Sequence, residues 1–573
     1  MELENLSLQN NVLQGLTTAK STPNIQYEMA IDTVATGAYK VSPYYINKVS
    51  EIYFKPEAQL RHQHYLVYDT ARVEFEMAKD AKYWMASPLQ DIFAGDMYAP
   101  KTSARQETFA FDPIFYSSTD KNDRQEPAFY QKAWDKGITN YTNAEGSTSA
   151  SYSVVHSNWS IEYNDVNVPY ALGKGFYASV EAFANNSNTA LVRLPKADNS
   201  YLYEPLKSTK ALSTIATRGA NVGKLAKDDD IVIILADSDT EKTWETTEGV
   251  IADGDGTHFL LGNPYMYPLD MTNFLKANEA VLAQKYWTLV DGTVAVGTPD
   301  VEFEWSDGTS LGQIAPMQAF FVELKEGVMA GETTKVIFRP DMMVGETLVT
   351  TSALRSSVSA KNPVLSLIAE KGDLRSLAFV SVCDDAVNGY ENDKDAVVMI
   401  DSELTDIPQV YTVGGDRAVG VNVVKGIQNI PLGVYARENE DITLTIEGIG
   451  GFIGTLYLYD AVTQKTETLV GDSHTLILNG SSHGRYFLRS SDSPTSNESI
   501  QADGVSIYSP VKGQVIVSAT EPLKQVQVFT TNGTMVRSLV PNQPVYTFDL
   551  PQGFYIIRAV TGEMVKSEKV QVR

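Results

Sequence analysis

An acidic loop with glycines between its carboxylates is the first stretch whose residue types could do chemistry. Asp253-Gly-Asp255-Gly-Thr257 places oxygen-bearing side chains at alternate positions. Calcium binds several oxygen ligands, and glycine allows the tight loop that brings them together. The glutamate that closes an EF-hand loop is missing here. Asp253 and Asp255 are therefore a candidate calcium site, with solvated turn carboxylates as the alternative.

Two other acidic stretches offer similar oxygen ligands. They are residues 388–395, Asn-Gly-Tyr-Glu-Asn-Asp-Lys-Asp, and residues 228–230, Asp-Asp-Asp. Solvated turn carboxylates are the default interpretation of each acidic stretch. Calcium is the one cofactor that the sequence suggests, and a thermal shift against EDTA tests it.

Residues 308–312, Gly-Thr-Ser-Leu-Gly, match the G-x-S-x-G pattern of a hydrolase nucleophile. That pattern requires a strand before Ser310 and a helix after it, above a parallel sheet. A strand-like stretch, 301–305, precedes Ser310, but a proline-interrupted stretch and another strand follow it. We therefore predict a glycine-rich hairpin turn here and no catalytic serine.

The other residues of catalytic or metal-binding type are sparse. Among six histidines, His62 and His64 are two apart and would face the same side of a strand. Because no zinc-type partner motif lies nearby, ordinary surface or cross-strand histidines are the better interpretation. Cys383, the single cysteine, lies in an apolar stretch and is expected to be a buried core thiol. The sequence predicts no catalytic residue and no enzyme.

Aromatic side chains of the type that stacks on sugars are also present. Tyr83, Trp84, Trp134, Trp159 and Trp305 each lie within an apolar or alternating stretch. Core packing is therefore the expected role of these five residues.

The elements that must position these residues are mostly strands. Apolar and polar residues alternate in 72–77, 441–446 and 455–459, as they do in half-buried strands. The best helix candidate begins after Asp270, a capping residue, and covers the region near 271–283. We predict an all-β protein of tandem β-sandwich domains with few short helices.

The net charge of −25 at pH 7 is spread along the chain. We do not expect nucleic-acid binding, because such binding requires clustered Lys and Arg to displace counterions. The longest apolar run, residues 231–236, is far shorter than the roughly 20 residues that span a bilayer. The first residues lack a basic segment and an apolar core, which predicts either a cytoplasmic chain or a mature portion of a longer precursor.

Composition shifts along the chain predict the domain organisation. Polar, Ser-rich residues 490–504 read as a linker, and softer boundaries fall near 150 and 350. The prediction is a β-rich domain at 1–150, a β-sandwich domain at 151–350 with the short helix, a β-sandwich domain at 351–489, the linker at 490–504, and a C-terminal module at 505–573.

Two segments of the first half resemble each other. Residues 83–89 form an apolar stretch ending in Ser87-Pro88, and residues 259–265 form one ending in Asn263-Pro264. A loop and an Asp-Met pair follow each stretch, at Asp96 and at Asp270. The pattern indicates duplication of one β-sandwich unit.

The C-terminal module reads as seven short strands with turns at 512–513, 532–533 and 561–562. Asn532-Gly533 between alternating strands is typical of a tight hairpin in which both turn residues have positive φ. Seven strands in about 70 residues predict a small immunoglobulin-like sandwich.

This module resembles the C-terminal sorting domain of the type IX secretion system of Bacteroidetes. Asn532 and Gly533 match its hairpin, and Leu550, Gly553 and Tyr555 match its following strand. Arg573 would be the basic residue that ends the last strand. The resemblance covers about the last 70 residues and implies that the module is an export or anchoring signal.

Other segments are similar to large Bacteroidetes surface and adhesin-like proteins. They are residues 53–60, 95–98, 261–265, 389–396, 416–422 and 430–434. This resemblance implies a non-enzymatic surface protein, adhesin-like or structural, at the extracellular or outer-membrane surface of a Gram-negative bacterium. Its expected partners are secretion or surface-anchoring machinery and host or bacterial glycans or proteins. The rival interpretation is a carbohydrate-binding or glycan-processing protein that carries the same kind of module.

Overall fold

The computed structural model describes most of the chain in detail. The described residues are 27–33, 39–46, 49–56, 58–60, 68–78, 81–99, 108–109, 128–132, 139–143, 152–156, 169–181, 189–195, 200–201, 213–214, 219–226, 230–235, 244–246, 249–251, 258–290, 292–299, 312–344, 363–398, 404, 406–415, 417–437, 440–452, 454–490, 505–510, 513–562 and 564–572.

The protein is all-β, as the sequence predicts. Strands make up 58% of the structure and helix 5%. The chain divides into two compact units, of which unit 1 comprises Met1–Leu282 and Gln313–Val349, and unit 2 comprises Ala283–Gly312 and Thr350–Arg573. The finer division into tandem sandwich domains stays a prediction.

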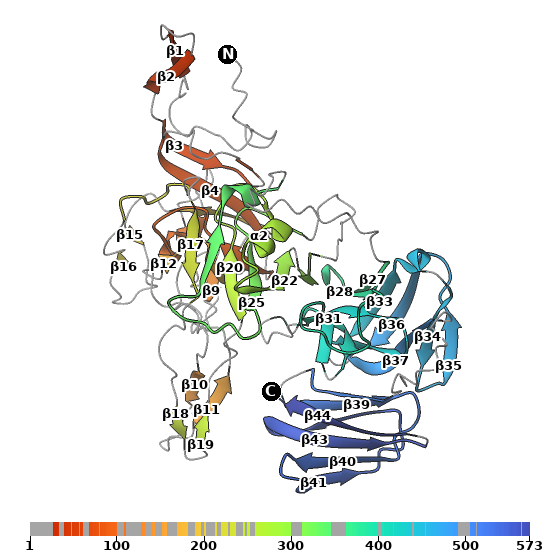
Figure 1. Cartoon of the computed structure of the whole chain (residues 1–573). Coiled ribbons are helices and arrows are strands. Elements are labelled where there is room, and N and C mark those ends of the chain that lie inside the picture. The colour runs from red at the N-terminus through yellow and green to blue at the C-terminus, as the bar shows by residue number, and fades with distance from the viewer. Residues whose placement is uncertain are drawn as a thin grey trace. The chain divides into compact units, whose positions relative to one another are not determined.

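In its described residues, unit 1 contains short strands, one α-helix and two 3-10 turns (Figure 1). Its elements are β1 (Tyr27–Thr33), β2 (Tyr39–Ile46), β3 (Val49–Phe54), β4 (Tyr68–Ala78), β5 (Lys82–Ala86), β6 (Ile92–Phe93), η2 (Ala94–Asp96), β7 (Tyr98–Ala99), β8 (Thr108–Phe109), β9 (Ala128–Lys132), β10 (Thr139–Asn143), β11 (Tyr152–His156), β12 (Pro169–Tyr170), β13 (Gly175–Glu181), β14 (Thr189–Leu194), β15 (Ser200–Tyr201), β16 (Ser213–Thr214), β17 (Ile231–Ile234), β18 (Trp244–Thr246), β19 (Gly249–Ile251), β20 (His258–Gly262), β21 (Leu269–Asp270), α2 (Met271–Ala277), β24 (Gln313–Ile314), β25 (Ala319–Leu324), β26 (Lys335–Phe338) and η5 (Pro340–Met342).

Unit 1 contains the same order of strand pairs twice, in agreement with the similarity between residues 83–89 and 259–265. Duplication of a β-sandwich unit stays a prediction. In half A, β5 pairs with β13 and β6 pairs with β12. In half B, β20 pairs with β25 and β21 pairs with β24. Each half adds one more antiparallel pair, β4 with β14 in half A and β17 with β26 in half B.

The two halves exchange equivalent hydrogen bonds. The Gly262 amide of half B donates to the Gly173 carbonyl of half A at 3.0 Å, and the Ala86 amide of half A donates to the Met317 carbonyl of half B at 2.8 Å. The isolated bridges Met85↔Gln318 and Lys174↔Leu261 repeat the same exchange. The two halves are therefore related by a local twofold arrangement.

Helix α2 confirms the predicted helix start but not its length. The Asp270 carboxylate accepts a hydrogen bond from the Asn273 amide at 3.0 Å, as an N-cap does. The helix ends at Ala277, and the Asn278 side chain binds the Ile337 backbone across 59 residues. The prediction that the helix continues to 283 is wrong, because β22 begins at Leu282.

Unit 2 up to Ser490 holds one connected set of strands. Its elements are β22 (Leu282–Val290), β23 (Thr293–Gly297), β27 (Val364–Lys371), β28 (Leu374–Val382), β29 (Ala396–Val397), β30 (Gln409–Gly414), β31 (Arg417–Val424), β32 (Ile430–Tyr435), β33 (Asp441–Glu447), η7 (Ile449–Gly451), β34 (Leu456–Asp460), β35 (Lys465–Thr468), β36 (Ser473–Asn479) and β37 (Ser482–Ser490). From β28, one branch runs through β31, β30, β32, β37 and β34, and the other through β27, β33 and β36. Apolar side chains from both branches share one core, so this part is sandwich-like.

The C-terminal module forms two further sheets within unit 2. Its strands are β38 (Val505–Tyr508), β39 (Gln514–Ala519), β40 (Gln525–Thr530), β41 (Met535–Leu539), β42 (Val545–Asp549), β43 (Gly553–Val560) and β44 (Val565–Val572). One sheet has the order β38-β39-β42 and the other β41-β40-β43-β44. The dark blue strands of Figure 1 include β39 of the first sheet and β40, β41, β43 and β44 of the second. The predicted turns at 512–513, 532–533 and 561–562 all fall between strands of the module.

Candidate functional site

The Asn532-Gly533 turn joins β40 to β41, as the sequence predicts. Only Gly533 has a positive φ, +85°. The Thr530 amide donates to the Thr534 carbonyl and the Gly533 amide to the Thr530 carbonyl, both at 2.9 Å. The prediction that both turn residues have positive φ is therefore wrong. A register shift between Val528 and Phe529 accompanies a three-residue loop, which needs only its last residue in the left-handed region.

The other residues of the module motif have roles in folding. Leu550 and Tyr555 are buried in the module's own core. Gly553 begins β43 with φ of +156°, a backbone conformation that other residues rarely adopt. Arg573 lies outside the described residues. Leu550, Gly553 and Tyr555 thus contribute to the fold of the module, whereas Asn532 is exposed.

A buried aromatic cluster joins the module to the preceding strands of unit 2. Tyr411 of β30 and Tyr508 of β38 are both fully buried, and their rings meet edge to face with centroids 6.1 Å apart. The Tyr411 hydroxyl and His483 Nδ1 are 2.7 Å apart. Burial lowers the pKa of His483 to about 4, so this imidazole is neutral at pH 7.

Polar contacts extend the same junction. The Ser518 hydroxyl donates to the Gly484 carbonyl at 2.6 Å, and the Tyr459 hydroxyl donates to the Thr520 carbonyl at 3.1 Å. A Cβ on Gly484 would lie 2.4 Å from the Ser518 oxygen, so glycine permits the close approach. The module therefore has its own sheets and core but packs directly against its neighbour.

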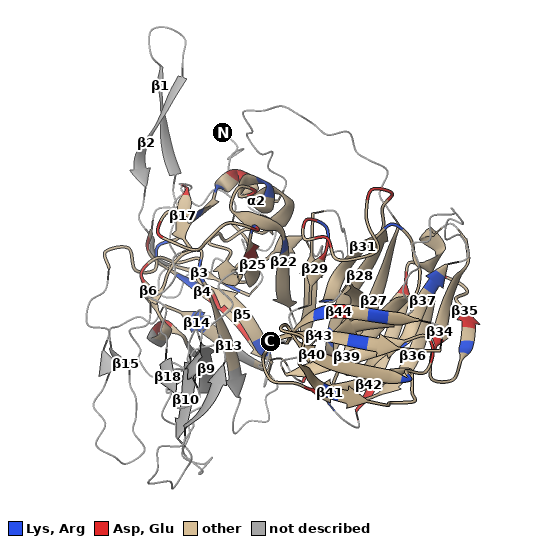
Figure 2. Cartoon of the chain, turned by 60° about the horizontal axis from the view of Figure 1, so that its bottom comes forward, with Lys and Arg blue, Asp and Glu red and all other residues tan. Residues whose placement is uncertain are grey.

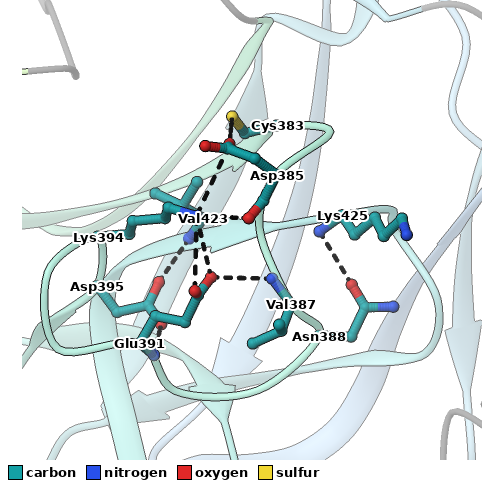
Figure 3. A network of polar contacts seen from close by, with 9 residues as sticks. All are labelled: Cys383, Asp385, Val387, Asn388, Glu391, Lys394, Asp395, Val423 and Lys425. Carbon is teal, nitrogen blue, oxygen red and sulfur yellow. Dashed lines mark hydrogen bonds and ion pairs between the residues drawn. The ribbon is translucent and has the colours of Figure 1, made fainter.

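The acidic stretch 388–395 is the candidate calcium loop that the structure describes (Figure 3). Asp395 is buried, and its two carboxylate oxygens accept the amides of Glu391 and Val423, each at 2.7 Å. Burial raises the pKa of this carboxyl to about 6. Glu391 accepts the Val387 amide at 2.9 Å, and Asn388 accepts the Lys425 amide at 3.1 Å. The loop's oxygens thus bind backbone donors.

Lys394 and Cys383 complete this network. The Lys394 ammonium donates to the Asp385 carbonyl at 2.6 Å and lies 3.4 Å from a Glu391 oxygen. The Cys383 thiol donates to the Asp385 carboxylate at 2.6 Å, and this bond, with Lys394, lowers the pKa of that carboxyl. Cys383 follows the end of β28 and is half-buried. The expectation of a fully buried strand thiol is therefore wrong.

A lysine ammonium occupies the centre of the loop's remaining oxygens. Lys285 of β22 is 1% exposed. Its Nζ lies 3.1 Å from Asn392 Oδ1, 3.3 Å from the Tyr390 hydroxyl and 3.4 Å from the Asp395 carbonyl oxygen. An oxygen-lined loop of this type attracts a cation, and here the cation is a side chain from another strand. Because Lys285 precedes Asp395 by 110 residues, the sequence offered no local signal of it.

Most other sequence candidates fall outside the described residues. These are Asp253 and Asp255, Asp228, Ser310, and His62 and His64. Within the described ranges, no group of three His, Cys, Asp or Glu residues could hold a metal ion. Trp84 is buried and its ring packs edge-on to Phe321 at 4.7 Å, which confirms its core role.

No protein-family model matches the sequence, and no curated protein matches it. Among the helices of the described residues, none has the length and apolar character to span a membrane.

Proposed function

We propose that the protein is a non-enzymatic, exported surface protein, adhesin-like or structural, whose C-terminal module directs secretion or surface attachment. It would be displayed at the extracellular or outer-membrane surface of a Gram-negative bacterium. Its partners would be secretion or anchoring machinery and, through the other domains, glycans or proteins.

The separate strand pairing and the core of the module support this proposal. All seven strands of 505–572 pair only with one another in the described residues. Fifteen side chains of the module form a core of their own. A signal that export machinery recognises must keep its shape whatever body it follows, and a closed core provides that independence.

The acidic loop supports a structural role for the body of the protein. Its carboxylates and carbonyls bind backbone amides, Lys394 and Lys285, so they brace the loop. For the carbohydrate-binding alternative, Trp84 and Trp287 are both buried and offer no ring to a sugar. Trp134, Trp159 and Trp305 lie outside the described residues.

Deleting 505–573 tests the proposal in cells. We expect intact truncated protein to accumulate inside the cell and to be lost from the surface, as measured by protease accessibility and fractionation. Leu550→Asp, which places a charge in the module core, should have the same effect, whereas Gln552→Asp, at an exposed neighbouring position, should not. Normal display of the truncated chain would contradict the proposal.

A further inference from the structure

The outer face of the module's four-stranded sheet carries a row of apolar side chains. Cross-strand pairing aligns Met535 of β41, Phe529 of β40 and Ile556 of β43. Met535 is 54% exposed, and its neighbour Val536 is 48% exposed. Phe554, two residues before Ile556 on the same face, is 51% exposed. Exposed apolar side chains that adjoin one another mark interaction surfaces.

Positive charge borders this row. Arg558 lies two residues from Ile556, and Lys569 pairs directly with Ile556, with its ammonium 4.7 Å from the Phe554 ring centre. The exposed positions of β44 are Val565, Ser567, Lys569 and Gln571, none of them acidic. In Figure 2 blue bands cross the strands beside the labels of β43 and β44.

The whole module differs in charge from the rest of the chain. Residues 505–573 contain seven Lys or Arg and four Asp or Glu, a net charge of +3. Because the chain carries −25 in total, the other 504 residues carry −28. A partner of this face is therefore expected to be acidic at the contact.

Strand β41 ends the sheet beside the apolar row. Within the described residues it pairs only with β40, and four of its five residues are exposed. Its outer edge therefore presents backbone donors and acceptors that a further strand would satisfy. The opposite edge strand, β44, carries Lys566, Glu568 and Lys569, and charged side chains of this kind protect an edge against pairing.

We propose that β41 accepts an added strand from a partner protein, with apolar side chains beside Met535 and Val536 and a carboxylate opposite Arg537, an exposed residue whose guanidinium also donates to the Asp549 carbonyl at 3.1 Å. This inference deepens the proposed function and rests on it, since it says how a partner would recognise the module. Strand addition supplies main-chain hydrogen bonds for affinity and alternate side chains for specificity.

Two other occupants of the face fit less well. A lipid surface leaves the backbone edge of β41 without hydrogen-bond partners, whereas a strand satisfies them. A second copy of this chain, pairing β41 antiparallel in the register of fullest overlap, would place Arg537 opposite Arg537. Like charges directly opposite destabilise a strand pair. An acidic strand from a different protein avoids this repulsion.

Two blocked nine-residue peptides test the inference on the purified full chain. Both alternate threonine and valine, and they differ only in a central glutamate or a central lysine. We expect the glutamate peptide to bind about fivefold more tightly, from the cross-strand charge pair, and to slow amide hydrogen exchange at 535–539. Arg537→Glu should reverse the preference, and Lys566→Glu, a matched charge reversal on the other edge, should leave it unchanged.

Three results would overturn strand addition. They are equal affinity for the two peptides, binding without slower exchange at 535–539, and undiminished binding of a glutamate peptide that is N-methylated at alternate residues. The two proposals fail separately. Surface display of the chain lacking 505–573 contradicts the export role only, and the peptide results on purified protein contradict strand addition only.

Discussion

The two halves of unit 1 form the same turn after β5 and after β20 but use different residues. Both turn after a strand with a side-chain oxygen that binds the amide two residues ahead: Ser87 Oγ accepts the Leu89 amide at 3.1 Å, and Asn263 Oδ1 accepts the Tyr265 amide at 3.0 Å. Asn263 also donates to the Tyr267 and Ile314 carbonyls, each at 2.9 Å. The shared geometry is set by the turn, and the amide side chain adds bonds that a hydroxyl cannot reach.

The helical turns that follow begin at equivalent positions but are capped from opposite ends. Phe93 and Asp270 are equivalent, because each pairs with the strand before the second turn of its half. In half A, Asp96 reaches back to the Phe93 amide at 3.0 Å, and a single 3-10 turn forms. In half B, Asp270 reaches forward and a seven-residue helix forms. Asp96 and Asp270, which the similarity in the sequence matched, are therefore not equivalent in the structure.

Backbone conformation at the second turn is preserved even where the residue is not. Gly173 has φ of +77° and its equivalent, Met317, has φ of +65°. A side chain in this region costs about 1 kcal/mol or more, yet Met317 is buried in the core of unit 1. Burial of a methionine side chain contributes about 2 kcal/mol, which offsets the strain. The reciprocal hydrogen bonds between the halves thus determine the backbone conformation at this position, whether the residue is Gly173 or Met317.

Removing the turn side chains is expected to give the largest difference in unfolding free energy between the two halves. Asn263→Ala removes three buried hydrogen bonds and is expected to cost about 4 kcal/mol of unfolding free energy. Ser87→Ala, the matched change in half A, should cost about 1 kcal/mol. Hydrogen exchange in β5 and β20 against urea, on the full chain, measures both. Equal losses would contradict the difference between the halves.

Adding a methyl group at the contact between the two halves is expected to have the next largest effect on stability. A Cβ on Gly262 would lie 2.0 Å from the Ala86 Cβ, so Gly262→Ala should destabilise unit 1 by about 3 kcal/mol through overpacking. Adding Ala86→Gly should restore most of the loss, because the pair then again holds one methyl group. Gly331→Ala, with no atom within 4 Å of the added Cβ, is the control. If the double variant is as unstable as Gly262→Ala, crowding against Ala86 is not the cause of the lost stability.

Gly173→Ala should cost about 2 kcal/mol, from strain at positive φ together with crowding. Its Cβ would lie 2.8 Å from Ile233 Cδ1. Gly327 has φ of +82° and nothing within 4 Å, so Gly327→Ala measures the strain alone, about 1 kcal/mol. If the two variants lose the same stability by urea denaturation, crowding by Ile233 plays no part.

Loss of the N-cap in half B should have the smallest effect. Asp270→Ala removes the bond to the Asn273 amide and is expected to cost about 1 kcal/mol. Faster amide exchange should be confined to α2, as mass spectrometry would show. Lys276→Ala, at an exposed position in the same helix, should change little. Exchange that also rises in β5 and β6 would mean that the cap supports both halves.

Local patterns in the sequence were sufficient for the strands, the seven-stranded module and the start of α2. Alternation in 441–446 and 455–459 matches β33 and most of β34, because half-buried strands alternate whatever they pack against. The Asn532-Gly533 hairpin was placed correctly, but its turn type was not, since a bulge in the neighbouring strand altered the loop.

Contacts between distant segments were decided only by the tertiary structure. Nothing near 388–395 indicates that Lys285 would provide the loop's cation, and nothing near Gly262 indicates that Ala86 would face it. Alternation and capping are properties of a few consecutive residues, so the amino-acid order determined them. Which charge neutralises the loop at 388–395 depends on a contact across 110 residues, where chain proximity carries no information.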